Sequence, residues 1–179
     1  MMYRIFFCSL FCSLALLSAV SWKLPDRIYK KVAKEVRTTF KTDTFELSPV
    51  HIPSDLSKEM KGGIAPETLF SIHKEEKLLG YAYIATALSK TDTYEYLVLL
   101  DTRLIIAKTK VLIYREDYGS EIGSKRWLKQ FIGKSYKNTL TYQKDIIAIS
   151  GATISASSMT MAINTFLRNV VILHNNHIL

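Results

Sequence analysis

A short turn rich in hydroxyl groups, residues 149–155, is the part of this sequence best suited to chemistry. It reads Ile-Ser-Gly-Ala-Thr-Ile-Ser and leads directly into an apolar segment with helical spacing. Serine and threonine before a helix accept hydrogen bonds from the free amides of its first turn. The exposed N–H groups and the helix dipole also attract phosphate. Because Gly151 permits strained backbone angles and Ala152 adds little bulk, the turn predicts a hydroxyl group presented beside an anion site.

The N-terminal residues 1–21 have the pattern of an export signal or a single membrane anchor. A short positive start, Met1 to Arg4, precedes the uncharged apolar run Ile5 to Val20, and Ala19-Val20-Ser21 has small residues where a signal peptidase reads. The run is slightly shorter than the ~20 apolar residues that span a bilayer, which favours a signal, while an uncleaved anchor stays open. We therefore expect residues 22–179 to form an exported domain, periplasmic or on the outer side of the cytoplasmic membrane.

The cysteines and charges limit the chemistry of that domain. Both cysteines, Cys8 and Cys12, lie in the apolar run, so a cleaved product has no disulfide framework, haem attachment motif or iron–sulfur site. His174 and His177 have a His-x-x-His spacing without a third ligand nearby, so no metal site is predicted. The net charge is +8, but the lysines look scattered along the sequence, which indicates a solvated surface and no nucleic-acid partner.

Apolar spacing predicts several helices. An amphipathic helix is expected over Asp26–Phe40, a short helix over Ser54–Lys61, another over Ser124–Phe131, and a final helix from Ile154 to about Leu173. The expected core positions are Ile28, Val32, Val36 and Phe40 in the first helix, and Met161, Phe166, Val170 and Leu173 in the last.

The middle of the chain is predicted to be rich in strands joined by short polar turns. Turns are expected at Glu75-Glu76 and at Ser89 to Thr93, and Asp101 is interpreted as a turn residue at the end of a strand. Such close spacing favours an antiparallel meander, so the fold class is α+β with one mainly antiparallel sheet packed with helices. The expected extended segments are Phe45–Ile52, Leu69–His73, Leu78–Leu88, Tyr94–Leu100 and Leu104–Tyr114.

Three segments, in order, carry a resemblance to a known family. Glu116 to Gly123, after a long strand, is similar to a family segment of the type Glu-Thr-Pro-Gly-Leu-Gly, and Trp127 to Lys134 resembles a helix with a Gln-Phe-x-Gly-Lys ending. Ser150 to Thr153, before a helix of small residues, resembles an attachment motif. All three resemble the FMN-binding domain family, which includes members from the Rnf electron-transport complex and from the sodium-translocating NADH:quinone oxidoreductase. The resemblance covers roughly Gly80 to Val170.

The resemblance implies a function and a set of site residues. In that family a separate flavin transferase, using FAD and a divalent metal, joins FMN through its phosphate to the motif threonine. It implies an exported, membrane-associated electron-transfer flavoprotein with FMN on Thr153, served by a membrane reductase or another redox partner and having no catalytic residues of its own. The implied cofactor-binding residues are Thr153, Ser150, Gly151, Ala152, Ser155, Glu116, Tyr118 and Gly119.

One departure and two alternatives accompany this interpretation. The family usually has an Asp three residues before the motif serine, whereas this chain has Ile147, with Asp145 as the nearest acid. The rings of Tyr118 and Trp127 are suited to stacking on a flavin, and Trp127 is alternatively a core residue of its helix. The alternatives in function are a domain that binds FMN without a covalent bond and an exported interaction module that has no cofactor.

Overall fold

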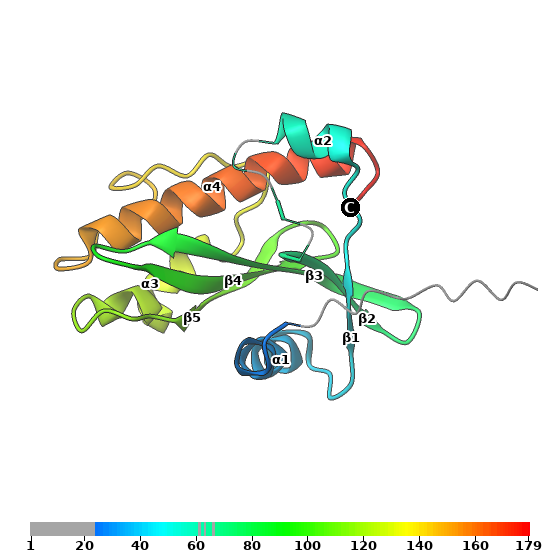
Figure 1. Ribbon diagram of the computed structural model, residues 1–179, viewed down its shortest axis with the longest axis horizontal. Coiled ribbons are helices and arrows are strands. Elements are labelled where there is room, and N and C mark those ends of the chain that lie inside the picture. Colours follow the sequence, from blue (N-terminus) through cyan, green and yellow to red (C-terminus); the bar gives the residue numbers. More distant parts are fainter. Residues whose placement is uncertain (1–23, 61, 63, 66) are drawn as a thin grey trace, which may run out of the picture.

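A five-stranded antiparallel sheet forms the middle layer of the molecule, between α1 on one face and α4 on the other (Figure 1). The computed structural model describes residues 24–60, 62, 64–65 and 67–179, so the segment predicted as an export signal lies outside the described residues. The strand order β1-β2-β3-β4-β5 follows the sequence, which confirms the predicted α+β fold with an antiparallel meander. The strands are β1 (Glu46–Pro49), β2 (Leu69–Lys74), β3 (Lys77–Leu88), β4 (Thr93–Asp101) and β5 (Ile106–Ile113).

Helix α1 (Asp26–Phe40) covers one face of the sheet. It has the predicted bounds, and it ends at Lys41, whose backbone is left-handed with a φ of 52°. Its apolar stripe packs on a mainly aliphatic cluster, with Phe40 partly buried at the margin. Burial of such a stripe is the main source of stability for an amphipathic helix. The cluster contains Ile28, Val32, Val36, Phe70, Ile72, Ala82, Ile84, Leu97, Leu99 and Leu112.

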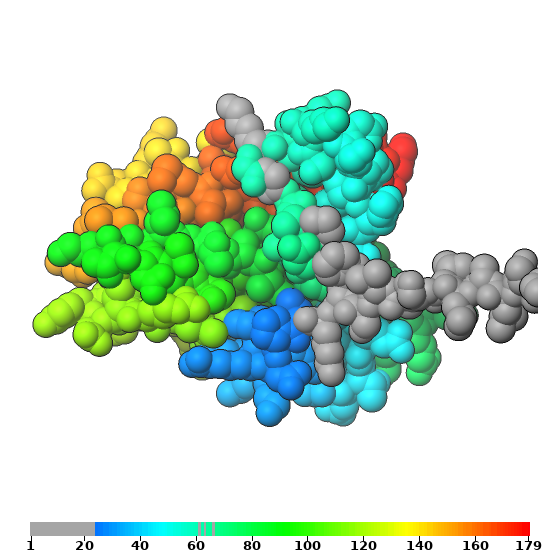
Figure 2. All heavy atoms as spheres, in the orientation of Figure 1, coloured from blue at the N-terminus to red at the C-terminus, as the bar shows by residue number. Residues whose placement is uncertain are grey.

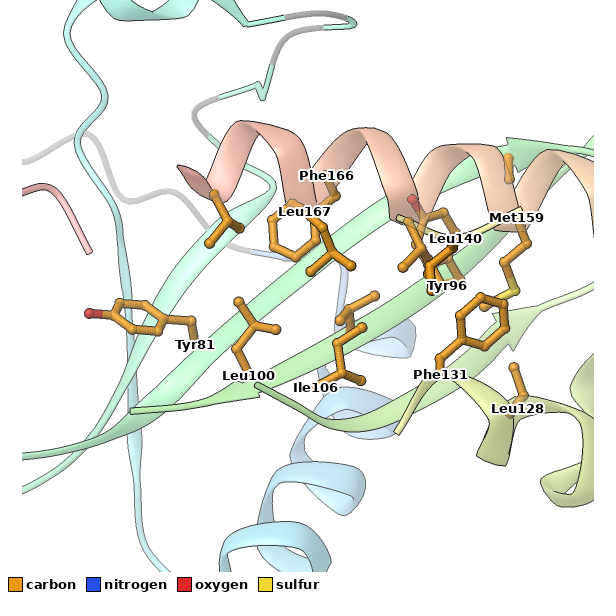
Figure 3. Packing of buried hydrophobic residues seen from close by; sticks show 14 of the residues in the cluster. Tyr81, Tyr96, Leu100, Ile106, Leu128, Phe131, Leu140, Met159, Phe166 and Leu167 are labelled. Atoms are coloured by element: carbon orange, nitrogen blue, oxygen red, sulfur yellow. The ribbon is translucent and has the colours of Figure 1, made fainter. Parts of the chain in front are cut away.

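Helix α4 (Thr153–Asn175) covers the other face (Figures 2 and 3). Figure 3 shows Met159, Phe166 and Leu167 of this helix directed toward the strands. The prediction of Met161 as a core residue is wrong, because its side chain is 60% exposed whereas Met159 is fully buried. Two residues correspond to about 200° of helical rotation, so these two methionines face opposite sides. Shorter elements complete this layer: α2 (Ser54–Glu59), η1 (Ser120–Gly123), α3 (Lys125–Leu128) and η2 (Lys129–Phe131).

The antiparallel order determines which loops meet. β3 ends at Leu88, β4 begins at Thr93 and β5 ends at Ile113, so the turn between β3 and β4 lies at the same edge of the sheet as the end of β5. Helix α4 begins at this edge, where its orange start lies beside the green β3–β4 turn in Figure 1. Asp101 accepts hydrogen bonds from the amides of Arg103 and Ile105, which confirms it as a turn residue at the opposite edge.

The described part of the chain contains no helix with the length and hydropathy that a membrane span requires.

Candidate cofactor site

A pocket of about 550 Å³ lies where α4 begins, at the edge of the sheet described above. Three segments line it: the β3–β4 turn, the residues that follow β5, and the hydroxyl-rich turn. The structure thus brings together the two predicted segments that are about 35 residues apart in sequence, and the volume is in the range of about 300–1,000 Å³ typical of small-molecule sites. The lining residues are Lys90, Thr91, Arg115, Glu116, Asp117, Tyr118, Gly151, Ala152, Thr153, Ile154 and Ser155.

Gly119 joins two of these segments at close range. Its φ is +78°, and a Cβ atom added to it would lie 2.9 Å from the Ala152 Cβ and 3.1 Å from the Gly151 carbonyl oxygen. Glycine is therefore required at this position both for its backbone conformation and for the approach of the turn. The predicted site residue Gly119 lies outside the pocket lining but allows the two lining segments to approach each other. Ser150 is exposed and also lies outside the lining.

The first turn of α4 differs from the prediction. Ala152 is the N-cap residue, and the described residues provide no side-chain hydrogen bond to cap the helix. The expected serine or threonine cap is therefore wrong. The amides of the first turn thus have no side-chain acceptor among the described residues, and residues 151–155 line the pocket, an arrangement that suits a phosphate group. Thr153, the first residue of the helix, is exposed and lines the same pocket.

Two tyrosines form hydrogen bonds to Ser155 in the first turn of α4. The hydroxyl of Tyr94 donates to the Ser155 carbonyl oxygen at 2.7 Å, and the hydroxyl of Tyr114 lies 3.0 Å from the Ser155 Oγ. The two rings meet edge to face, with centroids 5.5 Å apart. Burial raises the pKa of Tyr94 well above its ordinary value, so its phenol stays protonated and remains a donor. Ser155, which is 2% exposed, is thus fixed as the floor of the pocket.

Charged side chains tie the loops of the pocket to the sheet. The Glu116 carboxylate accepts hydrogen bonds from the Thr91 amide at 2.6 Å and from the Thr91 hydroxyl at 3.2 Å. The bond from the Thr91 amide is the main reason why the pKa of Glu116 is lowered. Arg115 binds both carboxylate oxygens of Glu95, at 2.8 and 2.6 Å, and lowers the pKa of that carboxyl group. Glu116 and Arg115 therefore position the pocket walls, because their charged groups already have protein partners.

The two candidate stacking residues lie in different surroundings. Tyr118 lines the pocket with its side chain 83% exposed, so its ring is accessible to a flat ligand. Trp127 is 5% exposed, its Nε1 donates to the Ile147 carbonyl oxygen at 2.7 Å, and its ring packs edge to face on Phe131. The interpretation of Trp127 as a core residue is confirmed.

The residues at the departure from the family pattern lie outside the pocket lining. The side chain of Ile147 is 71% exposed, and its backbone amide donates to the Gln130 side-chain oxygen at 2.8 Å. Asp145 accepts a hydrogen bond from the Thr141 amide, within its own turn, at 2.9 Å. Asp145, the acid nearest to the position of the family's aspartate, therefore stabilises a neighbouring loop.

Sequence reasoning missed the contribution of the β3–β4 turn. Lys90 and Thr91 line the pocket, as do Arg115, Asp117 and Ile154 beside the predicted residues. The sequence predicts the segment Ser89 to Thr93 only as a turn. The predicted meander could have indicated this contribution, because alternate hairpin turns of an antiparallel sheet lie at the same edge. Among the described residues, no group of three His, Cys, Asp or Glu side chains is placed to hold a metal ion.

Comparison with known proteins agrees with this geometry. Residues 90–168 match the family model described as the FMN-binding domain. The match therefore supports an FMN-binding domain in this segment, which is 79 of the 179 residues, and with it a flavin-binding protein. The matched segment contains every residue that lines the pocket, from Lys90 to Ser155. A search of curated proteins found no match.

Proposed function

We propose that this protein is an exported electron-transfer flavoprotein that carries FMN through a phosphoester bond to Thr153. The observation that carries the proposal is the position of Thr153. Its exposed side chain lies at the start of a helix for which the described residues provide no side-chain cap, in a pocket shared with the segment Glu116 to Tyr118. The pocket supplies amides for the phosphate, the Ser155 floor beneath it and the accessible ring of Tyr118 for the flavin.

The attachment step requires another protein. The threonine oxygen attacks the flavin-side phosphorus of FAD, an oxygen–phosphorus bond forms, the pyrophosphate bond breaks and AMP leaves. A threonine hydroxyl is a weak nucleophile unless a base removes its proton. Glu116, the carboxylate with hydrogen bonds to Thr91, is a poor base because its pKa is lowered. A separate flavin transferase with a divalent metal therefore has to supply the base and activate FAD.

Export and electron transfer rest on other features. The pattern of residues 1–21 supports export or anchoring, and both cysteines lie within that segment. A bound flavin would supply the redox chemistry, while the residues of this chain hold and orient it. We expect electrons to arrive from a membrane reductase or another redox partner on the same side of the membrane. The domain itself would act as a carrier without substrate chemistry.

Intact-mass measurement tests the covalent bond. The full chain is produced together with a flavin transferase. Its mass is expected to increase by the mass of FMN less one water, because a phosphoester forms between FMN and the threonine hydroxyl. Thr153→Ala should abolish the increase, whereas Ser120→Ala, at an exposed position outside the pocket lining, should retain it. The same spectrum reports whether residues 1–21 have been removed.

Three results would overturn parts of the proposal. A yellow protein that loses its flavin on denaturation, with no mass increase in either variant, indicates an FMN domain without a covalent bond. A colourless protein under all conditions indicates an interaction module without a cofactor. A covalently bound flavin that dithionite cannot reduce reversibly contradicts the role in electron transfer.

A further inference from the structure

A second concave surface lies between α1 and β5 and shares no lining residue with the cofactor pocket. It has a volume of about 460 Å³ and is lined by five lysines from four different elements, and we call it the lysine groove. Along the sequence these lysines look scattered, whereas the fold gathers them on one surface. The five are Lys34 on α1, Lys108 and Lys110 on β5, Lys125 on α3 and Lys129 on η2.

The charges of the lysine groove are mostly unbalanced. Among its described lining residues Glu35 is the single acid, and its carboxylate lies 3.5 Å from the Lys108 Nζ. The lining therefore has a formal net charge of +4. Like charges gathered on one surface repel one another and create a positive potential that attracts anionic groups. An anionic partner would relieve this repulsion.

The floor of the groove is fixed and partly apolar. The Thr109 hydroxyl donates to the Leu128 carbonyl oxygen at 2.9 Å, which ties β5 to α3 under the lysines. The side chain of Ile132 lines the groove and is 44% exposed. Lysine stems lie along apolar surface while their amines stay in water. The groove thus combines an apolar floor with a rim of amines.

We propose that the lysine groove is a docking surface for an acidic segment of a partner protein, one that carries aspartates or glutamates beside apolar side chains. A polypeptide segment can enter a concave surface and contact both the floor and the amines. A flat lipid surface would contact only the rim. The docking does not depend on a bound flavin. Arg115 follows Lys110 by five residues, about 17 Å of extended chain, so a partner docked in the groove lies near the cofactor pocket.

Binding of an acidic probe tests the docking surface. The full chain is titrated into a labelled oligoglutamate peptide, and fluorescence anisotropy is recorded at about 0.01 M and about 1 M salt, where the Debye lengths are about 30 and 3 Å. Binding is expected at low salt and should be lost at high salt. The combined variant Lys110→Glu, Lys125→Glu and Lys129→Glu should weaken it about tenfold or more, because three attractions become repulsions.

A matched variant separates the effect of the groove lysines from the effect of the net charge of the protein. Lys58→Glu, Lys74→Glu and Lys77→Glu change the charge by the same amount at exposed positions on α2, β2 and β3. This control should bind within about threefold of the unaltered chain. Circular dichroism verifies that both variants are folded. If the groove variant unfolds, Lys125→Gln with Lys129→Gln replaces it, with a smaller loss expected.

Three outcomes would overturn the proposal: no binding of the peptide at low salt, an equal loss in both charge-reversal variants, or unchanged peptide binding in the groove variant. If that variant instead loses binding only to phosphatidylglycerol vesicles, the surface contacts membrane. Flavin attachment is expected to persist in both variants, so failure of the docking surface is distinguishable from failure of the proposed cofactor function.

Discussion

The two faces of the sheet are buried by different chemistry. The face under α1 is packed mainly with aliphatic side chains, among them Val32, Leu97 and Leu99. The face under α4 contains tyrosines, of which Tyr94 and Tyr96 are both at most 1% exposed. Strand β4 contributes to both faces, because its successive residues alternate between them. One strand thus supports a face that only packs and a face that also positions the start of a helix.

The difference lies in the direction of the interactions. Aliphatic packing depends on buried area and shape, and it has no preferred partner atom. A buried phenol needs a hydrogen-bond partner, so its position is coupled to that partner. For Tyr94 the partner is the Ser155 carbonyl oxygen, in the first turn of α4. The α1 face therefore stabilises the fold, whereas the α4 face also fixes the first turn of α4, which lines the cofactor pocket.

The largest expected effect is on the aliphatic face. Leu97→Ala removes a fully buried side chain that packs in the α1 cluster, and the cavity should lower the free energy of unfolding by about 2–5 kcal/mol. Urea unfolding measures this loss. Flavin attachment to the protein that remains folded should be unchanged, because Leu97 packs on the face of the sheet opposite α4. Loss of attachment without unfolding would show that the two faces are not separable.

The second prediction compares two glycines with the same backbone conformation. Gly119 and Gly133 have φ values of +78° and +82°, but an added Cβ at Gly133 meets nothing within 4 Å. Both changes to Ala should cost about 1 kcal/mol for the left-handed backbone. Gly119→Ala also forces a contact with Ala152, so we expect a total of about 2–3 kcal/mol and slower flavin attachment.

Time courses with limiting flavin transferase, followed by intact mass, distinguish the two glycine variants. Gly133→Ala serves as the control and should be flavinylated at the normal rate. Equal rates for both variants would indicate that the close contact between Gly119 and Ala152 has no role in the site.

Periodic patterns in the sequence predicted the elements of both faces. The spacing of Ile28, Val32 and Val36 predicted α1 with its bounds, and the alternating segments predicted the strands to within two residues at most ends. Local patterns suffice there because each element buries one face at a regular period. Met161 was misplaced because α4 has apolar residues on more than one side, so the period alone did not select the buried one.

The site was predicted only in part, because its construction is not local. The sequence predicts site residues in the Glu116 segment and in the turn around Thr153, but the contact between these segments through Gly119 depends on how β5 and α4 pack. The role of Tyr94 depends on register across the sheet, since its partner Ser155 lies 61 residues away. The same limit hid the lysine groove, whose members come from four elements and gather only in the folded chain.

The smallest expected effect is that of a single hydroxyl on the tyrosine face. Tyr94→Phe removes the donor to the Ser155 carbonyl oxygen and should lower the free energy of unfolding by about 1 kcal/mol at neutral pH. It should also slow flavin attachment, because the first turn of α4 loses a support. Tyr96→Phe is the matched control: it removes a hydroxyl of similar burial, whose side-chain partner is Tyr83, and should leave attachment unchanged.

The pH dependence of stability sharpens this test. Burial raises the pKa of Tyr94 in the folded state, so the unfolded state loses the phenolic proton first, near the ordinary pKa of about 10. The stabilisation from the folded tyrosine is complete below that pH and is lost as the pH rises further. Urea unfolding above about pH 10 should therefore show a less steep decline for Tyr94→Phe than for the unaltered chain. A parallel decline in both would mean that Tyr94 is not the buried donor that supports the start of α4.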